Sequence, residues 1–168
     1  MTSTNTMTDP QVLNAGQIIA KYQNSAPVNV VGLAEELGLK VWESRSLAPN
    51  ISGKIFKDKL NGGPSGFSIV VNATENIFRR RFTVAHEIAH FLLHRGQLEK
   101  GELVDDTMYR SGLSTKEEAD ANKLAAYILM PLPLIKSLAA QGVNDVDSLA
   151  EKLQVSRTAM KIRLGIPT

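Results

Sequence analysis

The chain has 168 residues, 43% of them apolar and 21% charged, with 19 basic against 17 acidic side chains and no cysteine. This length and composition fit one domain with a hydrophobic core, and the missing cysteines exclude disulfides and thiolate metal sites. A net charge of +2 neither favours nor excludes a nucleic-acid partner. We expect a cytoplasmic protein without a membrane span, since no run approaches ~20 apolar residues and the N-terminus lacks signal-peptide features.

Two short helices are expected before the first strand. Residues 1–8 are polar and predict a disordered tail. Pro10 suits the first position of a helix that ends near Tyr22. Asn29 is the expected cap of a second helix over residues 30–37.

Three strands and a long apolar helix are expected next. Alternating and β-branched residues predict strands at 39–43, 51–57 and 67–71. A turn rich in glycine and proline separates the last two, so we expect a small antiparallel sheet. The helix should begin between Glu75 and Phe78 and end at Arg95, with the sheet packed beside it.

The remainder of the chain predicts helices. Residues 97–113 read as irregular, and Ser114 followed by Glu117 forms a capping box that opens a helix over 115–129. A segment with two prolines breaks that helix. Further helices are expected from Leu134, at 146–153 and at 157–163. We therefore predict an α+β fold, a mainly helical single domain over residues 9–168 whose C-terminal portion, 144–165, resembles a helix-turn-helix.

The long helix carries the motif His86-Glu87-Ile88-Ala89-His90. Histidines four residues apart lie on one face of a helix, so both imidazoles can bind one tetrahedral zinc ion. Glu87 is offset sideways, where its carboxylate can take a proton from a water molecule activated by the metal. The motif thus indicates a zinc-dependent peptidase with one ion per chain.

A third protein ligand is needed, and the remaining histidine is a poor candidate. His94 lies two helical turns from His86, about 12 Å along the axis, so both could share an ion only if the helix broke. We expect His94 at the helix end or in the wall of a cleft instead.

Acidic residues at the start of the 115–129 helix are better candidates. Glu118 is followed by apolar residues at helical spacing, which predicts that it faces the core, and Asp120 is the second choice. Glu117 is the expected capping residue. Asn122, one turn after Glu118, could hold that carboxylate or a ligating imidazole in place. For the transition-state oxyanion, the polar candidates are Tyr109, Arg110 and His94.

Two segments together resemble the ImmA/IrrE family of metallo-endopeptidases. They are RRFTVAHEIAHFLLH at 80–94 and EADANKLAAYILMP at 118–131, in which Leu124 replaces the usual phenylalanine. The resemblance implies an intracellular zinc peptidase of bacteria, their phages or mobile elements, which cleaves a helix-turn-helix repressor encoded nearby. Carried over by position, it implies His86, His90 and Glu118 as zinc ligands and Glu87 as the catalytic base.

A regulator is the alternative from another class of protein. Ser156 would cap a helix that carries Arg157, Lys161 and Arg163, which could contact DNA. Such a chain, binding DNA or a protein, would keep the metallopeptidase fold without needing catalysis. We favour two helices that pack on the domain, because a two-helix unit has little core of its own.

Overall fold

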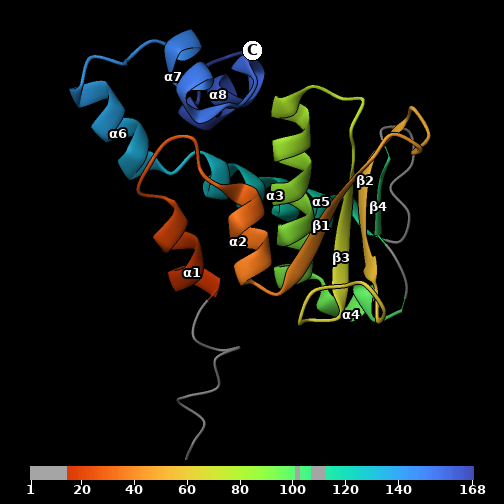
Figure 1. Cartoon of the computed structure of the whole chain (residues 1–168). Coiled ribbons are helices and arrows are strands. Elements are labelled where there is room, and N and C mark those ends of the chain that lie inside the picture. Colours follow the sequence, from red (N-terminus) through yellow and green to blue (C-terminus); the bar gives the residue numbers. More distant parts are fainter. Residues whose placement is uncertain (1–14, 101–102, 107–112) are drawn as a thin grey trace, which may run out of the picture.

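The computed structural model describes residues 15–100, 103–106 and 113–168, and it begins with two short helices (Figure 1). These are α1 (Ala15–Tyr22) and α2 (Val30–Glu36). As predicted, Asn29 caps α2, because its side chain accepts a hydrogen bond from the backbone N–H of Gly32 at 3.0 Å. The expected tail, residues 1–8, and the predicted helix start at Pro10 lie outside the described residues.

Four strands form one mixed sheet in the order β1-β3-β2-β4. Their bounds are β1 (Leu39–Ser44), β2 (Ile51–Lys57), β3 (Phe67–Asn72) and β4 (Leu103–Asp106). Strands β2 and β3 pair antiparallel, as expected, and so do β2 and β4. Strand β1 pairs with β3 in parallel, so the prediction of a purely antiparallel sheet was wrong.

Burial explains the strand order. Every residue of β3 is buried, and such a strand belongs in the middle of a sheet with a partner on each side. Strand β1 is partly exposed and takes the edge. The chain therefore places β3 between β1 and β2, which leaves β1 parallel to β3. Strand β4 falls in a segment that we expected to be irregular, because its two aspartates disfavour strands.

Helix α3 (Ile77–Leu93) packs against the sheet (Figure 1). Asn76 caps it by accepting a hydrogen bond from the N–H of Arg79 at 3.0 Å. Gly53 allows the close approach of helix and sheet, because a Cβ there would lie 2.6 Å from Cγ2 of Thr83 and 2.7 Å from the carbonyl oxygen of Val70. The helix ends at Leu93 with His94 as its C-cap, slightly before the predicted Arg95, and a short helix α4 (Arg95–Leu98) follows.

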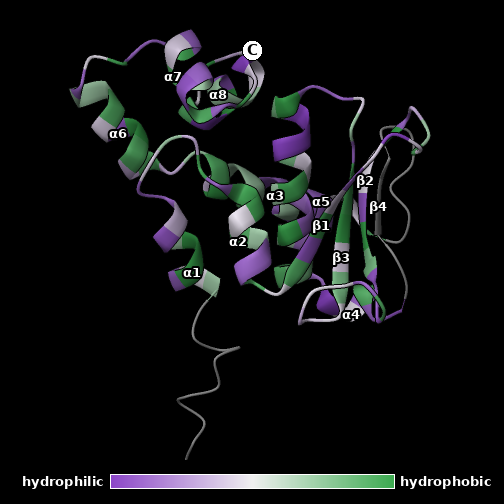
Figure 2. Ribbon diagram, in the orientation of Figure 1, coloured by the Kyte–Doolittle hydropathy of each residue, from purple (hydrophilic) through white to green (hydrophobic). Residues whose placement is uncertain are grey.

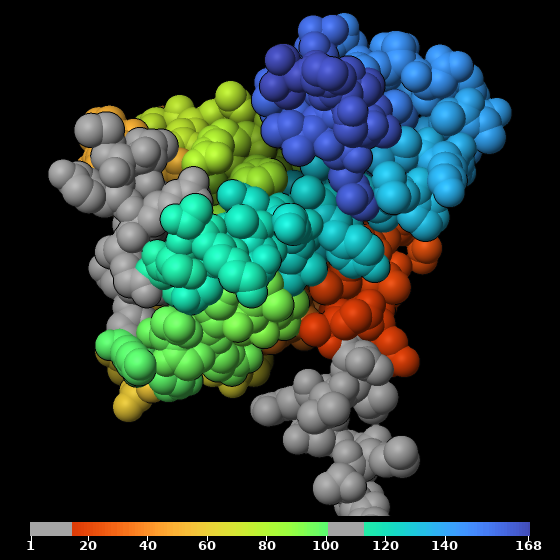
Figure 3. Space-filling view, turned by 180° about the vertical axis from the view of Figure 1, so that it is seen from behind, coloured from red at the N-terminus to blue at the C-terminus, as the bar shows by residue number. Residues whose placement is uncertain are grey.

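Helix α5 (Thr115–Leu129) packs on the side of α3 that faces the viewer in Figure 3. Helix α6 (Leu132–Ala140) follows the break at Pro131 and begins two residues earlier than predicted. The predicted cap is present, with Ser114 Oγ accepting from the N–H of Glu117 at 3.1 Å. By length and hydropathy alone, the stretch Thr115–Ala140 could cross a membrane. It consists of two helices that contribute to the core, so this is weak evidence for a span.

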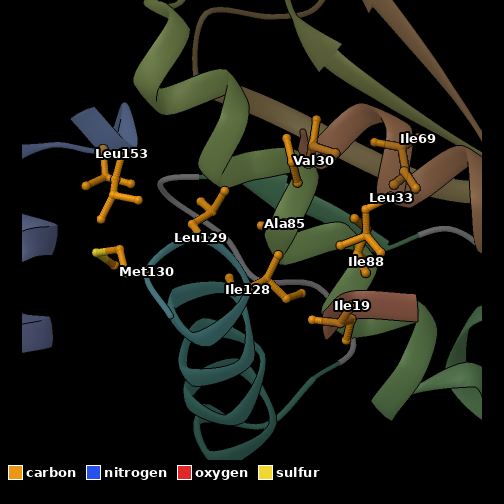
Figure 4. Close-up of a cluster of buried hydrophobic side chains, with 14 of the residues drawn as sticks. Ile19, Val30, Leu33, Ile69, Ala85, Ile88, Ile128, Leu129, Met130 and Leu153 are labelled. Atoms are coloured by element: carbon orange, nitrogen blue, oxygen red, sulfur yellow. The ribbon is translucent and has the colours of Figure 1, made fainter. Parts of the chain in front are cut away.

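Apolar side chains of α2, α3, α5 and the sheet meet in one core (Figure 4). The ribbon of Figure 2 shows the hydrophobic residues along α3 and β3. The fully buried members of the core include Leu33, Ile69, Ile88 and Ile128. Two sides of α3 are thereby fixed, one by the sheet and one by α5. The fold is α+β and mainly helical, as predicted.

The C-terminal helices α7 (Val146–Leu153) and α8 (Arg157–Leu164) pack on this core. Leu153 and Met160 are completely buried. Arg81 of α3 donates to the carbonyl oxygen of Val28 at 2.8 Å and to that of Gln154, at the end of α7, at 3.4 Å. Hydrogen bonds from α3 thus reach the C-terminal helices as well as the segment before α2.

Candidate metal centre

Three potential metal ligands meet where α3 and α5 cross. The ligand atoms of His86, His90 and Glu118 all lie within 4.8 Å of one another. The Nε2 atoms of the two histidines are 2.9 Å apart. Glu118 places one oxygen 3.2 Å from Nε2 of His86 and the other 3.6 Å from Nε2 of His90.

The local structure explains this convergence. His86 and His90 are one turn apart on the buried face of α3. Glu118 lies in the first turn of α5 and shares its buried face with Ala121 and Ala125, and only 8% of Glu118 is exposed. The other two acidic candidates point elsewhere. Glu117 contacts its cap residue Ser114, and Asp120 lies 4.0 Å from Lys116.

The donor set fits a zinc ion. A tetrahedral zinc with bonds of about 2.0–2.2 Å holds its ligand atoms roughly 3.3 Å apart, close to the three separations seen here. Two imidazoles and one carboxylate are a known ligand set of catalytic zinc sites, which leave the fourth position for water or substrate. The cluster can therefore bind a metal ion.

The electrostatics of the cluster favour the forms that bind a cation. Burial raises the pKa of Glu118, but hydrogen bonds from His86 and His90 and the charges of these histidines outweigh it and hold the pKa well below its usual range. Burial lowers the pKa of His90, and this effect outweighs the hydrogen bond and the negative charge of Glu118, which raise it. At neutral pH the carboxylate is thus ionised and His90 is neutral.

His94 ends α3 and supports His90. It is buried, and its Nδ1 lies 2.9 Å from Nδ1 of His90, whereas Nε2 of His90 is the atom near His86 and Glu118. If His90 offers the lone pair of Nε2 to a cation, its proton resides on Nδ1, where His94 can accept it. His94 therefore lies outside the ligand group, at the end of the helix, as the sequence predicted.

The remaining predicted site residues have different positions. Glu87 is only 1% exposed and follows His86 on α3. Asn122 lies one turn after Glu118, and both line a pocket of about 500 Å³. Tyr109 and Arg110, proposed for the oxyanion, lie outside the described residues.

Phe82 is a site neighbour that the sequence reasoning missed. Its ring stacks on that of His86, with centroids 6.4 Å apart and an angle of 26° between the planes. The sequence spacing could have predicted this contact, because Phe82 precedes His86 by one helical turn on the same face of α3.

Fold and donor set together define a metallopeptidase-type protein with a potential metal site between two helices. Comparison with known families gives the particular group. Residues 34–165 match the IrrE N-terminal-like domain of the peptidase M78 family. The chain therefore belongs to this family, which confirms the ImmA/IrrE resemblance seen in the two motifs.

Other comparisons concern the fold. No curated protein sequence matches the chain. Among solved structures, it resembles a Mycobacterium tuberculosis transcriptional regulator with a TM-score of 0.55 and 16% identity, over 94% of this chain and 43% of that one. The chain thus spans less than half the length of that regulator, and at this identity the likeness concerns the fold alone.

Proposed function

We propose that this chain is a cytoplasmic zinc-dependent endopeptidase that cleaves a helix-turn-helix transcriptional repressor encoded nearby. The observation that carries the enzymatic part is the convergence of His86, His90 and Glu118, all buried, with the buried Glu87 directly after His86 on α3. Membership of the peptidase M78 family supports the same activity. The repressor substrate and the location rest on the family resemblance.

His86, His90 and Glu118 would hold the ion. When bound, zinc would polarise the peptide carbonyl and lower the pKa of a water molecule. Glu87 would accept a proton from the attacking water and deliver it to the leaving amine. His94 would keep the proton of His90 on Nδ1, so that Nε2 stays directed at the ion.

Replacing Glu87 by glutamine tests catalysis apart from metal binding. Zinc-loaded wild-type protein and the Glu87→Gln variant would each be incubated with the repressor encoded beside the gene, and with a pool of random peptides. General-base catalysis contributes about 10²–10⁴ in rate, so the variant should lose at least a hundredfold in cleavage while it keeps its zinc. Equal cleavage by both proteins would contradict the mechanism.

A DNA-binding regulator is the second candidate, because the fold is shared with a transcriptional regulator. Two of the three basic residues that would contact DNA have partners within the chain. Arg157 lies 2.7 Å from Asp147, and Arg163 donates to the carbonyl oxygen of Met130 at 2.8 Å. These contacts favour the peptidase. Duplex binding that weakens steeply with salt would favour the regulator instead.

A further inference from the structure

The metal ligands belong to two rows of side chains that face each other across α3 and α5. Residues four apart stack along one side of a helix, so each row follows its helix axis. The rows are Phe78, Phe82, His86 and His90 on α3, and Glu118, Asn122, Ala126 and Met130 on α5. His86 contacts Glu118. From this contact, the α3 row continues toward the N-terminus of α3 to Phe82 and Phe78. The α5 row continues toward the C-terminus of α5 to Asn122, Ala126 and the C-cap Met130.

Beyond the ligands, these rows line an open pocket of about 620 Å³, and residues of α8 form another of its walls. We call it the α3–α8 pocket. Its apolar lining comes from α3, α5 with its C-cap, α8 and the segment between α7 and α8, and includes Phe78, Phe82, Ala126, Met130, Val155 and Ile162. This volume is within the range of about 300–1,000 Å³ that is usual for small-ligand pockets. A leucine or phenylalanine side chain therefore has room to enter it.

The α3–α8 pocket adjoins the candidate metal site through Asn122 and Phe82. Asn122 lines both this pocket and the smaller one beside Glu118. Phe82, whose ring stacks on that of His86, also lines the pocket. Four helical residues span about 6 Å along the axis, so Phe82 lies roughly that far from His86. An extended peptide covers the same distance in about two residues.

The walls of the pocket are held in place. Arg163 of α8 donates to the carbonyl oxygen of Met130 at the end of α5, and Arg81 connects α3 to the end of α7. Ile162 is 66% exposed although it lines the pocket, so an apolar group is offered to solvent at this position. An apolar side chain that enters would bury this surface.

We propose that the α3–α8 pocket binds an apolar side chain, leucine or phenylalanine, located two to three residues from the cleaved bond of the peptide substrate. The proposal rests on the proposed peptidase function of the adjacent site. It gives the C-terminal helices a role in the choice of substrate, with α8 as the outer wall of a specificity pocket.

Two experiments separate this proposal from the peptidase function. Hexapeptide libraries, each with phenylalanine, leucine, alanine or aspartate fixed at one position, would be cleaved by the zinc-loaded protein. The same libraries with p-benzoylphenylalanine at the fixed position would be photo-crosslinked to the Glu87→Gln variant, and the crosslinked residues identified by mass spectrometry. Cleavage tests the enzyme, whereas crosslinking tests the pocket even if no peptide is cleaved.

The proposal predicts at least a tenfold preference in kcat/KM for leucine or phenylalanine over alanine two to three residues from the cleaved bond. Ala159→Phe, which fills the pocket from α8, should remove this preference and leave zinc affinity unchanged. Ile162→Glu should weaken it without disturbing the core, because Ile162 is exposed. Ala140→Phe, at an exposed position of α6 outside the pocket, is the matched control and should behave like wild type.

The outcomes are distinct. Crosslinks to Phe82, Met130 or Ile162 would support the pocket, even in a protein that cleaves nothing. Cleavage without an apolar preference, an Ala159→Phe variant that keeps the preference, or crosslinks only at other residues would overturn the pocket proposal and leave the peptidase standing.

Discussion

The Nδ1 atoms of His90 and His94 lie 2.9 Å apart. His94, the last histidine of the chain, thus contacts the ring nitrogen of His90 that is not predicted to bind the metal. Both residues are buried, and His94 occupies the C-terminal end of α3. A hydrogen bond at this position fixes which nitrogen of His90 is free to bind a cation. The end of the helix thus contributes to the metal site.

Replacing His94 by alanine should weaken zinc binding about 10–100-fold, the usual effect of removing a residue that orients a ligating histidine. His94→Gln should restore part of the affinity, because a glutamine carbonyl can also accept the proton of His90. Competition with a zinc chelator would measure the dissociation constants. Unchanged affinity in His94→Ala would show that this contact does not support the site.

Neighbouring arginines on α3 should differ in their effect on stability. Arg81 is partly buried and donates to the backbone carbonyls of Val28, Leu153 and Gln154. Arg81→Met would leave buried acceptors without donors, at a cost of about 1–3 kcal/mol in the free energy of unfolding. Arg80→Met removes a contact to the exposed side chain of Glu43 and should cost at most about 1 kcal/mol. Urea denaturation measures both, and equal losses would contradict the assignment.

The approach of α3 to the sheet requires glycine at position 53. A methyl group there would meet Thr83 and a backbone oxygen, neither of which can move freely. Gly53→Ala should therefore destabilise the fold by about 1–3 kcal/mol. A Cβ added to Gly16, in α1, would have nothing within 4 Å, so Gly16→Ala should be neutral or stabilising by up to about 1 kcal/mol. Thermal unfolding measures both variants, and a Gly53→Ala protein as stable as wild type would refute the packing argument.

Asp145 should give α7 a pH-dependent cap. The N–H of Ser148 donates to its carboxylate at 2.8 Å, and this hydrogen bond lowers the pKa of Asp145. A lowered folded pKa means that the stabilisation is present at neutral pH and is lost as the pH falls below about 4. Asparagine caps as well but does not titrate there. The Tm difference between wild type and Asp145→Asn should therefore change below pH ~4, and a constant difference would contradict this.

Local signals in the sequence predicted most of the described helices and the strands β1, β2 and β3. The caps at Asn29 and Ser114 involve residues within one turn, so short sequence patterns contain the information. Pairing of β1 beside β3 depends on which strand is buried on both faces, which no local pattern states. Strand β4 was missed because its pairing with β2 outweighs the low strand propensity of its aspartates.

The candidate metal site was predictable in part. Spacing alone placed His86 and His90 on one face of a helix. The choice of Glu118 over Asp120 depended on which side of α5 faces α3, and apolar spacing gave the correct face. The α3–α8 pocket could not be predicted, because it is assembled from segments far apart in the sequence whose contacts form only in the folded chain.

Calorimetric zinc titration of the metal-stripped protein tests the central claim most directly, with Glu118→Gln compared with Glu117→Gln. These acids are adjacent in sequence, but only Glu118 lies with the two histidines. We predict one tight site per chain in wild type and in Glu117→Gln, and a much weaker site in Glu118→Gln. No zinc site in wild type, or equal affinity in both variants, would contradict a metal centre formed by His86, His90 and Glu118.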